Sequence, residues 1–405
     1  MTQSAIGTDP GKQGSRIASV DFMRGLALVV MAIDHSRDFL TNIPFQPENM
    51  SQTYPALFFT RWITHFCAPL FFFLAGTGAY LLRRQSDSPG AASRLLWTRG
   101  LWLILLEFTI IDYAWTFVFW QMGNVIWSIG CSMLLLALLV WLPDRLTLAF
   151  GLALILFHDL FDRVKSAELG QLGWLWGLLH RRGFIPHTHF FVLFPLVPLC
   201  GVMALGYVFG KVFDKSAEAR PRIILWIGVI STTAFILLRA FNAYGNPTAG
   251  IAASTPGEWH PQSTLAMSVV SFLNVEKYPP SLQFLLMTLG LALILFAFVE
   301  RWSRSEGFQR FALPIVIFGR VPLLFYILHL YAIHFAAILL AKAFHQPVGW
   351  LWRGSFWMNP IPEGYGHGLP LIYLIWFLIM VILYFPCAWF AEYRRRRKKW
   401  WLSYL

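Results

Sequence analysis

The amino-acid sequence predicts an all-α integral membrane protein, a polytopic bundle of about ten transmembrane helices with both termini in the cytoplasm. Of its 405 residues, 57% are hydrophobic and only 13% are charged, whereas soluble globular proteins carry about 25% charged residues. The mean hydropathy is +0.57, and the chain contains 37 Phe and 19 Trp. This apolar surface exceeds what one aqueous core could bury, so lipid is the expected solvent for most of the chain.

Besides composition and mean hydropathy, a series of apolar runs long enough to cross a bilayer predicts a membrane protein. A helix that crosses about 30 Å of hydrocarbon needs about 20 apolar residues. We expect a disordered tail over 1–15, one membrane domain over 16–393 and a basic tail over 394–405. Within the domain the expected spans, in order, are 18–34, 62–82, 95–112, 123–142, 146–161, 190–210, 223–241, 281–299, 321–341 and 370–391.

The positive charges of the connecting loops predict the orientation. One set of alternating loops carries 20 Lys and Arg and the other carries 10, and the richer set is expected in the cytoplasm. The cluster Arg394 to Lys399 belongs to the richer set and directly follows an apolar run, so it sets topology and does not indicate nucleic-acid binding. The long connections 162–189, 242–280 and 342–369 then lie on the far, extracytoplasmic side, where long loops commonly carry function.

No metal and no bound cofactor are expected. The four cysteines lie in apolar stretches without a CxxC pair, so they are interpreted as buried small hydrophobes. The histidines and carboxylates of the first two spans show neither HxxxH nor HExxH spacing.

The first span carries ionisable residues, which are costly in lipid and therefore functional candidates. Asp21 and Arg24 are three residues apart and can pair on one helix face, which is also consistent with a purely structural ion pair. Arg24 and His35 are eleven residues apart, which places them within about 20° on one face and about 16 Å apart along the axis.

His35 is the first candidate for a catalytic base. Asp34 precedes it and Asp38 follows at i+3, so a carboxylate could hold one ring nitrogen while the other faces a substrate. An interfacial histidine bonded to a loop carbonyl is the alternative. His65 lies at the same level of the second span, so two histidines could face one cavity, and the choice between them stays open.

Further ionisable residues lie deeper in the expected bundle. Glu107 stands alone in the third span and should be neutral or paired. Tyr326 and His329 share a face of the ninth span, where they could line a substrate path or join helices by hydrogen bonds. The expected substrate-binding residues are Arg24, Asp34, Arg37, Glu107, Tyr326 and His329.

Five segments resemble the heparan-alpha-glucosaminide N-acetyltransferase-like family, in particular its bacterial members. They are RIASVDFMRGLAL at 16–28, DHSRDF at 34–39, THFCAPLFFFLAG at 64–76, EKYPPSL at 276–282 and GRVPLLFYILH at 319–329. The spacing of Arg24 and His35 is also similar to that in the wider class of transmembrane acyltransferases that O-acetylate glycans.

The resemblance implies an acyltransferase of the cell inner membrane with a reactive histidine. The donor would be cytoplasmic acyl-CoA, with acetyl-CoA expected, and the acceptor an extracytoplasmic glycan or glycolipid. Membrane lipid is a further expected partner. The protein could also form a homodimer. Cationic side chains that could bind the CoA phosphates are Arg83, Arg84, Arg94 and Arg99. The sequence alone reveals no oxyanion donor.

Two other classes of function fit the same composition. The main alternative is a proton-coupled solute transporter or exporter, in which Arg24, His35, Glu107 and His329 line a pathway. A structural or sensory membrane protein without turnover is the other. Binding of acetyl-CoA separates the acyltransferase from both.

Overall fold

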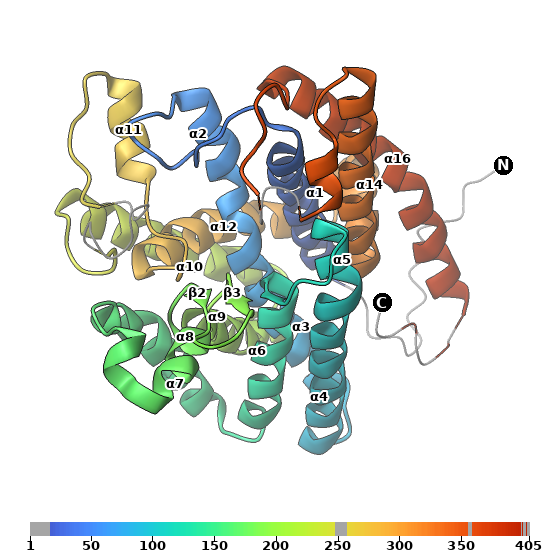
Figure 1. Cartoon of the computed structure of the whole chain (residues 1–405). Helices are drawn as coiled ribbons and strands as arrows, with labels where there is room; N and C mark the ends of the chain where they lie inside the picture. Colours follow the sequence, from blue (N-terminus) through green and yellow to red (C-terminus); the bar gives the residue numbers. More distant parts are fainter. Residues whose placement is uncertain (1–16, 248–256, 355–358, 398, 400–401, 403–405) are drawn as a thin grey trace.

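The computed structural model of the chain describes residues 17–247, 257–354, 359–397, 399 and 402, and these residues are mostly helical (Figure 1). The expected tail over 1–15 lies outside the described residues. In chain order the α-helices are α1 (Ala18–Leu40), α2 (Pro55–Trp62), α3 (Cys67–Gln85), α4 (Pro89–Leu106), α5 (Asp112–Thr116), α6 (Val125–Leu139), α7 (Asp144–Phe157), α8 (Gly173–Leu179), α9 (Leu196–Phe209), α10 (Ala219–Ala240), α11 (Leu265–Leu273), α12 (Leu282–Trp302), α13 (Glu306–Arg320), α14 (Pro322–Ala343) and α16 (Leu369–Arg396). The short 3-10 and π segments are η1 (Ile63–Phe66), η2 (Glu107–Ile111), η3 (His158–Phe161), η4 (Ser166–Leu172), η5 (Gly210–Asp214) and η6 (Gly349–Trp352).

Six helical segments in the described part of the chain are long and apolar enough to cross a membrane. They are Pro55–Gln85, Leu196–Asp214, Ala219–Ala240, Leu282–Trp302, Pro322–Ala343 and Leu369–Arg396. The chain is therefore a multi-pass helical membrane protein by the length and composition of its helices.

The other four expected spans coincide with helices that are shorter or more polar. Helix α1 is 23 residues long, but it carries Asp21, Arg24, Asp34, Arg37 and Asp38. Helix α4 continues into the π-helical η2, and α6 and α7 have only 15 and 14 residues. Ten crossings and cytoplasmic termini thus remain predictions.

Local sequence explains where several helices begin. Ser88, Ser281 and Ser305 precede α4, α12 and α13, and each side-chain oxygen accepts a hydrogen bond from the backbone N–H three residues on, which satisfies a donor that the helix cannot. Helix α9 begins at Leu196, directly after Pro195. The expected span at 190–210 is therefore too long at its start.

A small sheet is a departure from the expected all-helical fold. Strands β1 (Met122–Gly123), β3 (Phe191–Val192) and β2 (Gly183–Phe184) pair in that order, with β1 and β3 parallel and β2 antiparallel to β3. The sheet joins the start of α6 to the loop before α9. It therefore fixes the positions of the residues that flank its strands, Asn124 and Arg182.

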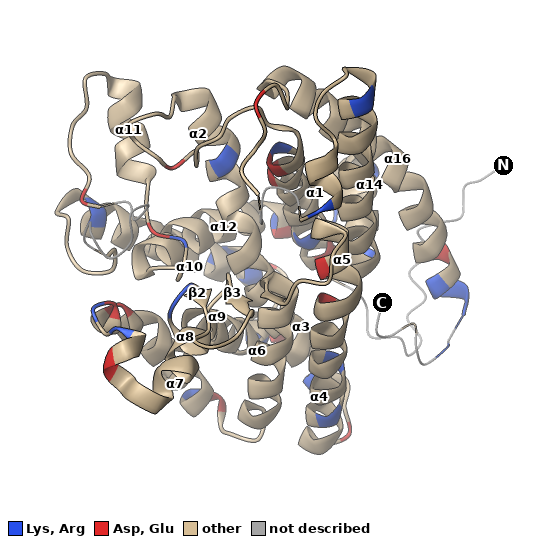
Figure 2. Ribbon diagram, in the orientation of Figure 1, with Lys and Arg blue, Asp and Glu red and all other residues tan. Residues whose placement is uncertain are grey.

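Helix α1 packs at the centre of the bundle against α3, α12, α13, α14 and α16. Its closest contact is with α13, where a Cβ added to Gly25 would lie 1.9 Å from the Ile315 carbonyl oxygen. A Cβ on Gly319 would lie 1.8 Å from the Asp21 carbonyl oxygen, so both positions require glycine for this approach. Charged residues lie on α1 inside the bundle as well as near the ends of α4 and α16 (Figure 2).

Candidate active site

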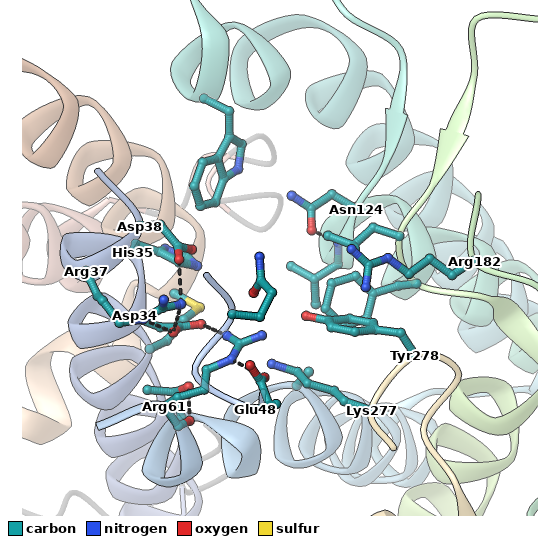
Figure 3. A pocket seen from close by; sticks show the side chains of 18 of the residues that line it. Asp34, His35, Arg37, Asp38, Glu48, Arg61, Asn124, Arg182, Lys277 and Tyr278 are labelled. Carbon is teal, nitrogen blue, oxygen red and sulfur yellow. Dashed lines mark hydrogen bonds and ion pairs between the residues drawn. The ribbon is translucent and has the colours of Figure 1, made fainter. Parts of the chain in front are cut away.

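A pocket of about 460 Å³ is bordered by the C-terminal half of α1 and by three further segments. These are the loop after β1, the loop before β2 and the loop before α12. We call it the histidine pocket. Its lining includes charged or imidazole side chains from α1, from α2 and the loop before it, and from the loops before β2 and α12. Several of them are shown in Figure 3: Asp34, His35, Arg37, Asp38, Glu48, Arg61, Arg182, Glu276 and Lys277.

One wall of the histidine pocket is a buried ion network. Arg37 Nη2 lies 3.0 Å from Asp34 Oδ1 and 2.6 Å from Asp38 Oδ1. Arg61 pairs with Asp34, and its Nε lies 2.8 Å from Glu48 Oε1. Each carboxylate thus has a guanidinium partner, as buried charges require. Asp34 and Arg37, which were expected to bind substrate, belong to this network.

His35 is held by another imidazole rather than by a carboxylate. His35 Nδ1 lies 2.7 Å from His329 Nε2, and His329 Nδ1 lies 3.0 Å from the Phe325 carbonyl oxygen. The expected contact between Asp38 and His35 is therefore replaced, because the Asp38 carboxylate is held by Arg37.

This chain of contacts fixes the tautomer of His35. A carbonyl oxygen only accepts, so the Nδ1–H of His329 donates to Phe325 and the Nε2 of a neutral His329 accepts. His35 Nδ1 must then carry the hydrogen that it donates to His329. His35 Nε2 keeps its lone pair, as a general base or nucleophile requires. The ring also packs edge-on against Trp115, with centroids 4.7 Å apart, which limits its rotation.

His65 occupies a different environment. Its side chain is fully buried and is not part of the pocket lining, and its Nε2 lies 3.5 Å from Glu48 Oε1. Burial by itself raises the pKa of the Glu48 carboxyl, but Arg61 and His65 hold that pKa well below its usual range. His35 thus lines the histidine pocket, whereas His65 contacts the ion network through Glu48 and does not line the pocket.

Glu107, which was expected to bind substrate, does not line this pocket. Its Oε2 accepts a hydrogen bond of 2.9 Å from the backbone N–H of Trp127 in the first turn of α6. The carboxyl group thus satisfies a helix donor that has no partner within the helix. Asp112 similarly accepts from the N–H of Met122 in β1.

The opposite wall of the histidine pocket is cationic. The Lys277 ammonium lies 5.1 Å and the Arg182 guanidinium carbon 4.9 Å from the centroid of the Tyr278 ring. Within the residues that the structure describes, no carboxylate forms an ion pair with either cation. Figure 3 shows Lys277, Tyr278 and Arg182 across the pocket from Asp34 and His35.

Asn124 supplies a hydrogen-bond donor beside these cations. It precedes α6, and its Oδ1 accepts a 2.8 Å hydrogen bond from the Val125 N–H. The amide oxygen is therefore occupied, and the Nδ2 group is left to donate. Figure 3 shows the side chain directed into the pocket.

A second pocket, of about 530 Å³, lies toward the N-terminal end of α1. We call it the arginine pocket because five arginines line it: Arg24, Arg84, Arg99, Arg320 and Arg394. Of the arginines expected to bind CoA, Arg84 and Arg99 are in this lining, whereas Arg83 and Arg94 are not.

Arg24 is paired as the sequence predicts. Its Nη1 lies 3.2 Å from Asp21 Oδ1 and 3.4 Å from the Gly319 carbonyl oxygen. Arg24 lines the arginine pocket and His35 lines the histidine pocket, so both residues of the predicted shared face of α1 border internal pockets.

The two pockets meet in the middle of the bundle. Phe71, Val125 and Tyr326 line both of them. Tyr326 therefore lies between the arginines and His35, as does the end of α6 that follows Asn124. A long, flexible ligand could occupy both pockets at once.

Sequence reasoning missed several residues of the site. Glu48, Arg61, Arg182, Lys277 and Asn124 line the histidine pocket but were not predicted to do so. Lys277 lies within one of the segments that carry the family resemblance, which was an available signal. Arg182 and Asn124 come together only through the pairing of β1, β3 and β2.

The fold and these pockets define a multi-pass helical membrane protein with a histidine at an internal site. Residues 16–242 match the family model described as heparan-alpha-glucosaminide N-acetyltransferase, catalytic. This match covers more than half of the chain, so the protein belongs to that family of membrane acetyltransferases. No curated protein matches the sequence. The matched region contains Arg24, His35 and His65, whereas Lys277, Tyr326 and His329 lie beyond it.

Proposed function

We propose that the protein transfers an acetyl group from cytoplasmic acetyl-CoA to an amine or hydroxyl of an extracytoplasmic sugar or glycolipid. The observation that carries this proposal is the meeting of the two pockets at Tyr326, with arginines on one side and His35 on the other. This arrangement suits a donor with an anionic end and a reactive end far apart.

In this proposal the arginine pocket holds the CoA phosphates. Guanidinium groups form paired, charge-assisted hydrogen bonds to phosphate oxygens. Arg24, Arg84 and Arg99 are the proposed contacts, and Arg320 and Arg394 line the same pocket. The pantetheine arm then passes Tyr326, which brings the thioester to His35.

His35 acts as the general base in the proposed step. Its Nε2 takes the proton from the acceptor amine or hydroxyl as that group attacks the thioester carbonyl. Asn124 Nδ2 donates to the oxyanion that forms. The carbon–sulfur bond then breaks, and the proton on His35 passes to the departing CoA thiolate, which returns His35 to its neutral form.

The cationic wall suggests the chemical class of the acceptor. Lys277 is buried, and Lys277 and Arg182 face the pocket without ion-pair partners among the described residues. We propose that they bind an anionic group of the acceptor, such as a phosphate or a carboxylate. A cell-envelope glycan or glycolipid with such a group fits this wall.

The orientation of the chain is part of the proposal. With both termini in the cytoplasm of an inner-membrane protein, the arginine pocket faces cytoplasmic acetyl-CoA. A reporter fused after Leu405 should then read cytoplasmic and one inserted near Gly257 external. An external reading after Leu405 would contradict this orientation.

Acetyl-CoA binding by purified full-length protein in detergent is the direct test of the proposal. Isothermal titration should show binding of acetyl-CoA and much weaker binding of an acetyl thioester that lacks the phosphates. A proton-coupled transporter would instead show no acetyl-CoA binding and would move a solute in proteoliposomes when a proton gradient is applied. That result would replace the acetyltransferase proposal.

A further inference from the structure

A second cluster of ligand-type side chains lies outside both pockets. His158, Asp162 and His180 each offer one ligand atom, and these atoms all lie within 4.8 Å of one another. The three residues are 3%, 8% and 1% exposed. His158 begins η3, directly after α7, Asp162 follows η3, and His180 follows α8.

Hydrogen bonding accounts for only part of this cluster. His180 Nε2 lies 2.9 Å from Asp162 Oδ1. Neither ring nitrogen of His158 has a hydrogen-bond partner among the described residues, although its Nδ1 lies 3.3 Å from Asp159 Oδ1. A buried imidazole without partners costs free energy, and a cation between these groups would remove that cost.

We propose that His158, Asp162 and His180 form a zinc site. Two imidazoles and a carboxylate are ligands that Zn²⁺ commonly takes, and the ion prefers a fourth, tetrahedral ligand. Asp159 or a water molecule completes the set. This proposal departs from the sequence-based expectation of no metal, because His180 lies 22 positions after His158 and no short motif joins them.

The position of the cluster gives the metal a structural role. Its ligands lie at the two ends of the segment that contains η4 and α8, so an ion would tie these ends together. Arg181 donates to the Asp162 carbonyl at 2.8 Å and to the Val164 carbonyl at 3.0 Å. The next residue, Arg182, lines the histidine pocket. The zinc ion would thus hold the segment that carries Arg182 in place.

The test is metal binding by full-length protein in detergent. After chelator treatment and dialysis, the protein should bind about one equivalent of Co²⁺ per chain, with the visible absorption of a tetrahedral cobalt site, and Zn²⁺ should displace it. His158→Gln and His180→Gln should each weaken Co²⁺ binding about tenfold or more, since each removes a ligand. His345→Gln, at an exposed histidine of another loop, should leave binding unchanged.

A second readout follows the segment itself. Limited proteolysis between residues 163 and 179 should be faster in the metal-free protein and slow again when Zn²⁺ is added. Gel filtration shows whether each variant is folded. Because two ligand variants are tested, the proposal can still be judged if one of them does not fold. The proposal is overturned if the wild-type protein binds no stoichiometric Co²⁺ or Zn²⁺, or if both ligand variants bind as it does. These measurements are independent of acetyl transfer.

Discussion

His35 Nδ1 and His329 Nε2 lie 2.7 Å apart, and they join α1 to α14 behind the part of the histidine pocket that His35 lines. Because His329 is in turn bonded to the Phe325 carbonyl, this pair determines which nitrogen of His35 carries the hydrogen. The residue that orients His35, the proposed base, lies 294 positions away in the sequence. His329 is a positioning residue in this account, since it acts through His35.

Replacing His329 should therefore impair turnover without impairing donor binding. His329→Leu removes the acceptor for the Nδ1–H of His35, so the ring loses its fixed tautomer and orientation. We expect kcat for acetyl transfer to fall about 10²-fold, within the range that general-base catalysis contributes. The KM for acetyl-CoA should change less than about twofold.

A conservative substitution at the same position distinguishes orientation from folding. His329→Gln can still accept from His35, so it should recover part of the lost kcat. If His329→Leu and His329→Gln are equally inactive and both also lose acetyl-CoA binding, His329 has a structural role and the tautomer argument is wrong.

The arginine pocket makes a prediction about donor binding. Arg99→Gln should weaken acetyl-CoA binding about tenfold or more, because a hydrogen bond to a charged group contributes about 1.5–3 kcal/mol. Arg94 lies five residues before Arg99 on α4 but does not line the pocket, so Arg94→Gln is the matched control. Equal losses in both variants would indicate a general charge effect and not a phosphate site.

The sequence predicted the fold to the extent that local patterns decide it. Each expected span coincides largely with a helix, because long apolar runs leave little alternative in lipid. Helix α13 was expected to be a cytoplasmic loop, since its charged start and Pro314 weaken the apolar pattern. Its contact with α1 depends on Gly25 and Gly319, a tertiary relationship that spacing does not reveal.

The site was predicted less completely, because most of its contacts are tertiary relationships that residue spacing does not reveal. His35 and Arg24 share one helix, so their spacing could place them on one face. The partner of His35 could not be found in this way, because Asp38 is nearer in sequence while His329 is nearer in space. Arg182 and Asn124 flank the two outer strands of a small sheet, at the end where Gly123 and Gly183 both pair with Val192. These strands have two residues each, too short to produce a periodic signal.

The cationic wall predicts selectivity for an anionic acceptor. Each of the variants Lys277→Met and Arg182→Gln should raise the KM for a phosphorylated or carboxylated sugar acceptor about tenfold. The KM for the neutral analogue of that acceptor should stay unchanged. Arg163→Gln is the control. Arg163 lies in the same connection between η3 and β2 as Arg182, but it does not line this pocket. Equal effects on charged and neutral acceptors would contradict an anion-binding role.

The pH dependence of acceptor binding should depend on Glu276. Burial raises the pKa of this carboxyl to about 7, although a hydrogen bond from the Tyr278 N–H and the nearby Arg182 act in the opposite direction. As pH rises through about 7, Glu276 gains a negative charge beside the cationic wall. Affinity for an anionic acceptor should therefore be higher at pH 6 than at pH 8.

Glu276→Gln removes this titration while keeping a similar shape. The variant should bind the anionic acceptor at pH 8 about as well as the wild-type protein does at pH 6. If the pH profile of KM is the same in the variant and the wild-type protein, another group controls it.

We propose that His35 acts as the general base at the end of a donor path that begins among the arginines of the arginine pocket. The most direct measurement compares wild-type protein and His35→Ala, in one preparation of each, for acetyl-CoA affinity and for transfer of labelled acetyl to acceptor. We predict that His35→Ala binds acetyl-CoA with unchanged affinity and transfers about 10²-fold to 10⁴-fold more slowly, the range expected for loss of a general base. Near-normal transfer by His35→Ala, or no acetyl-CoA binding by the wild-type protein, would contradict the account.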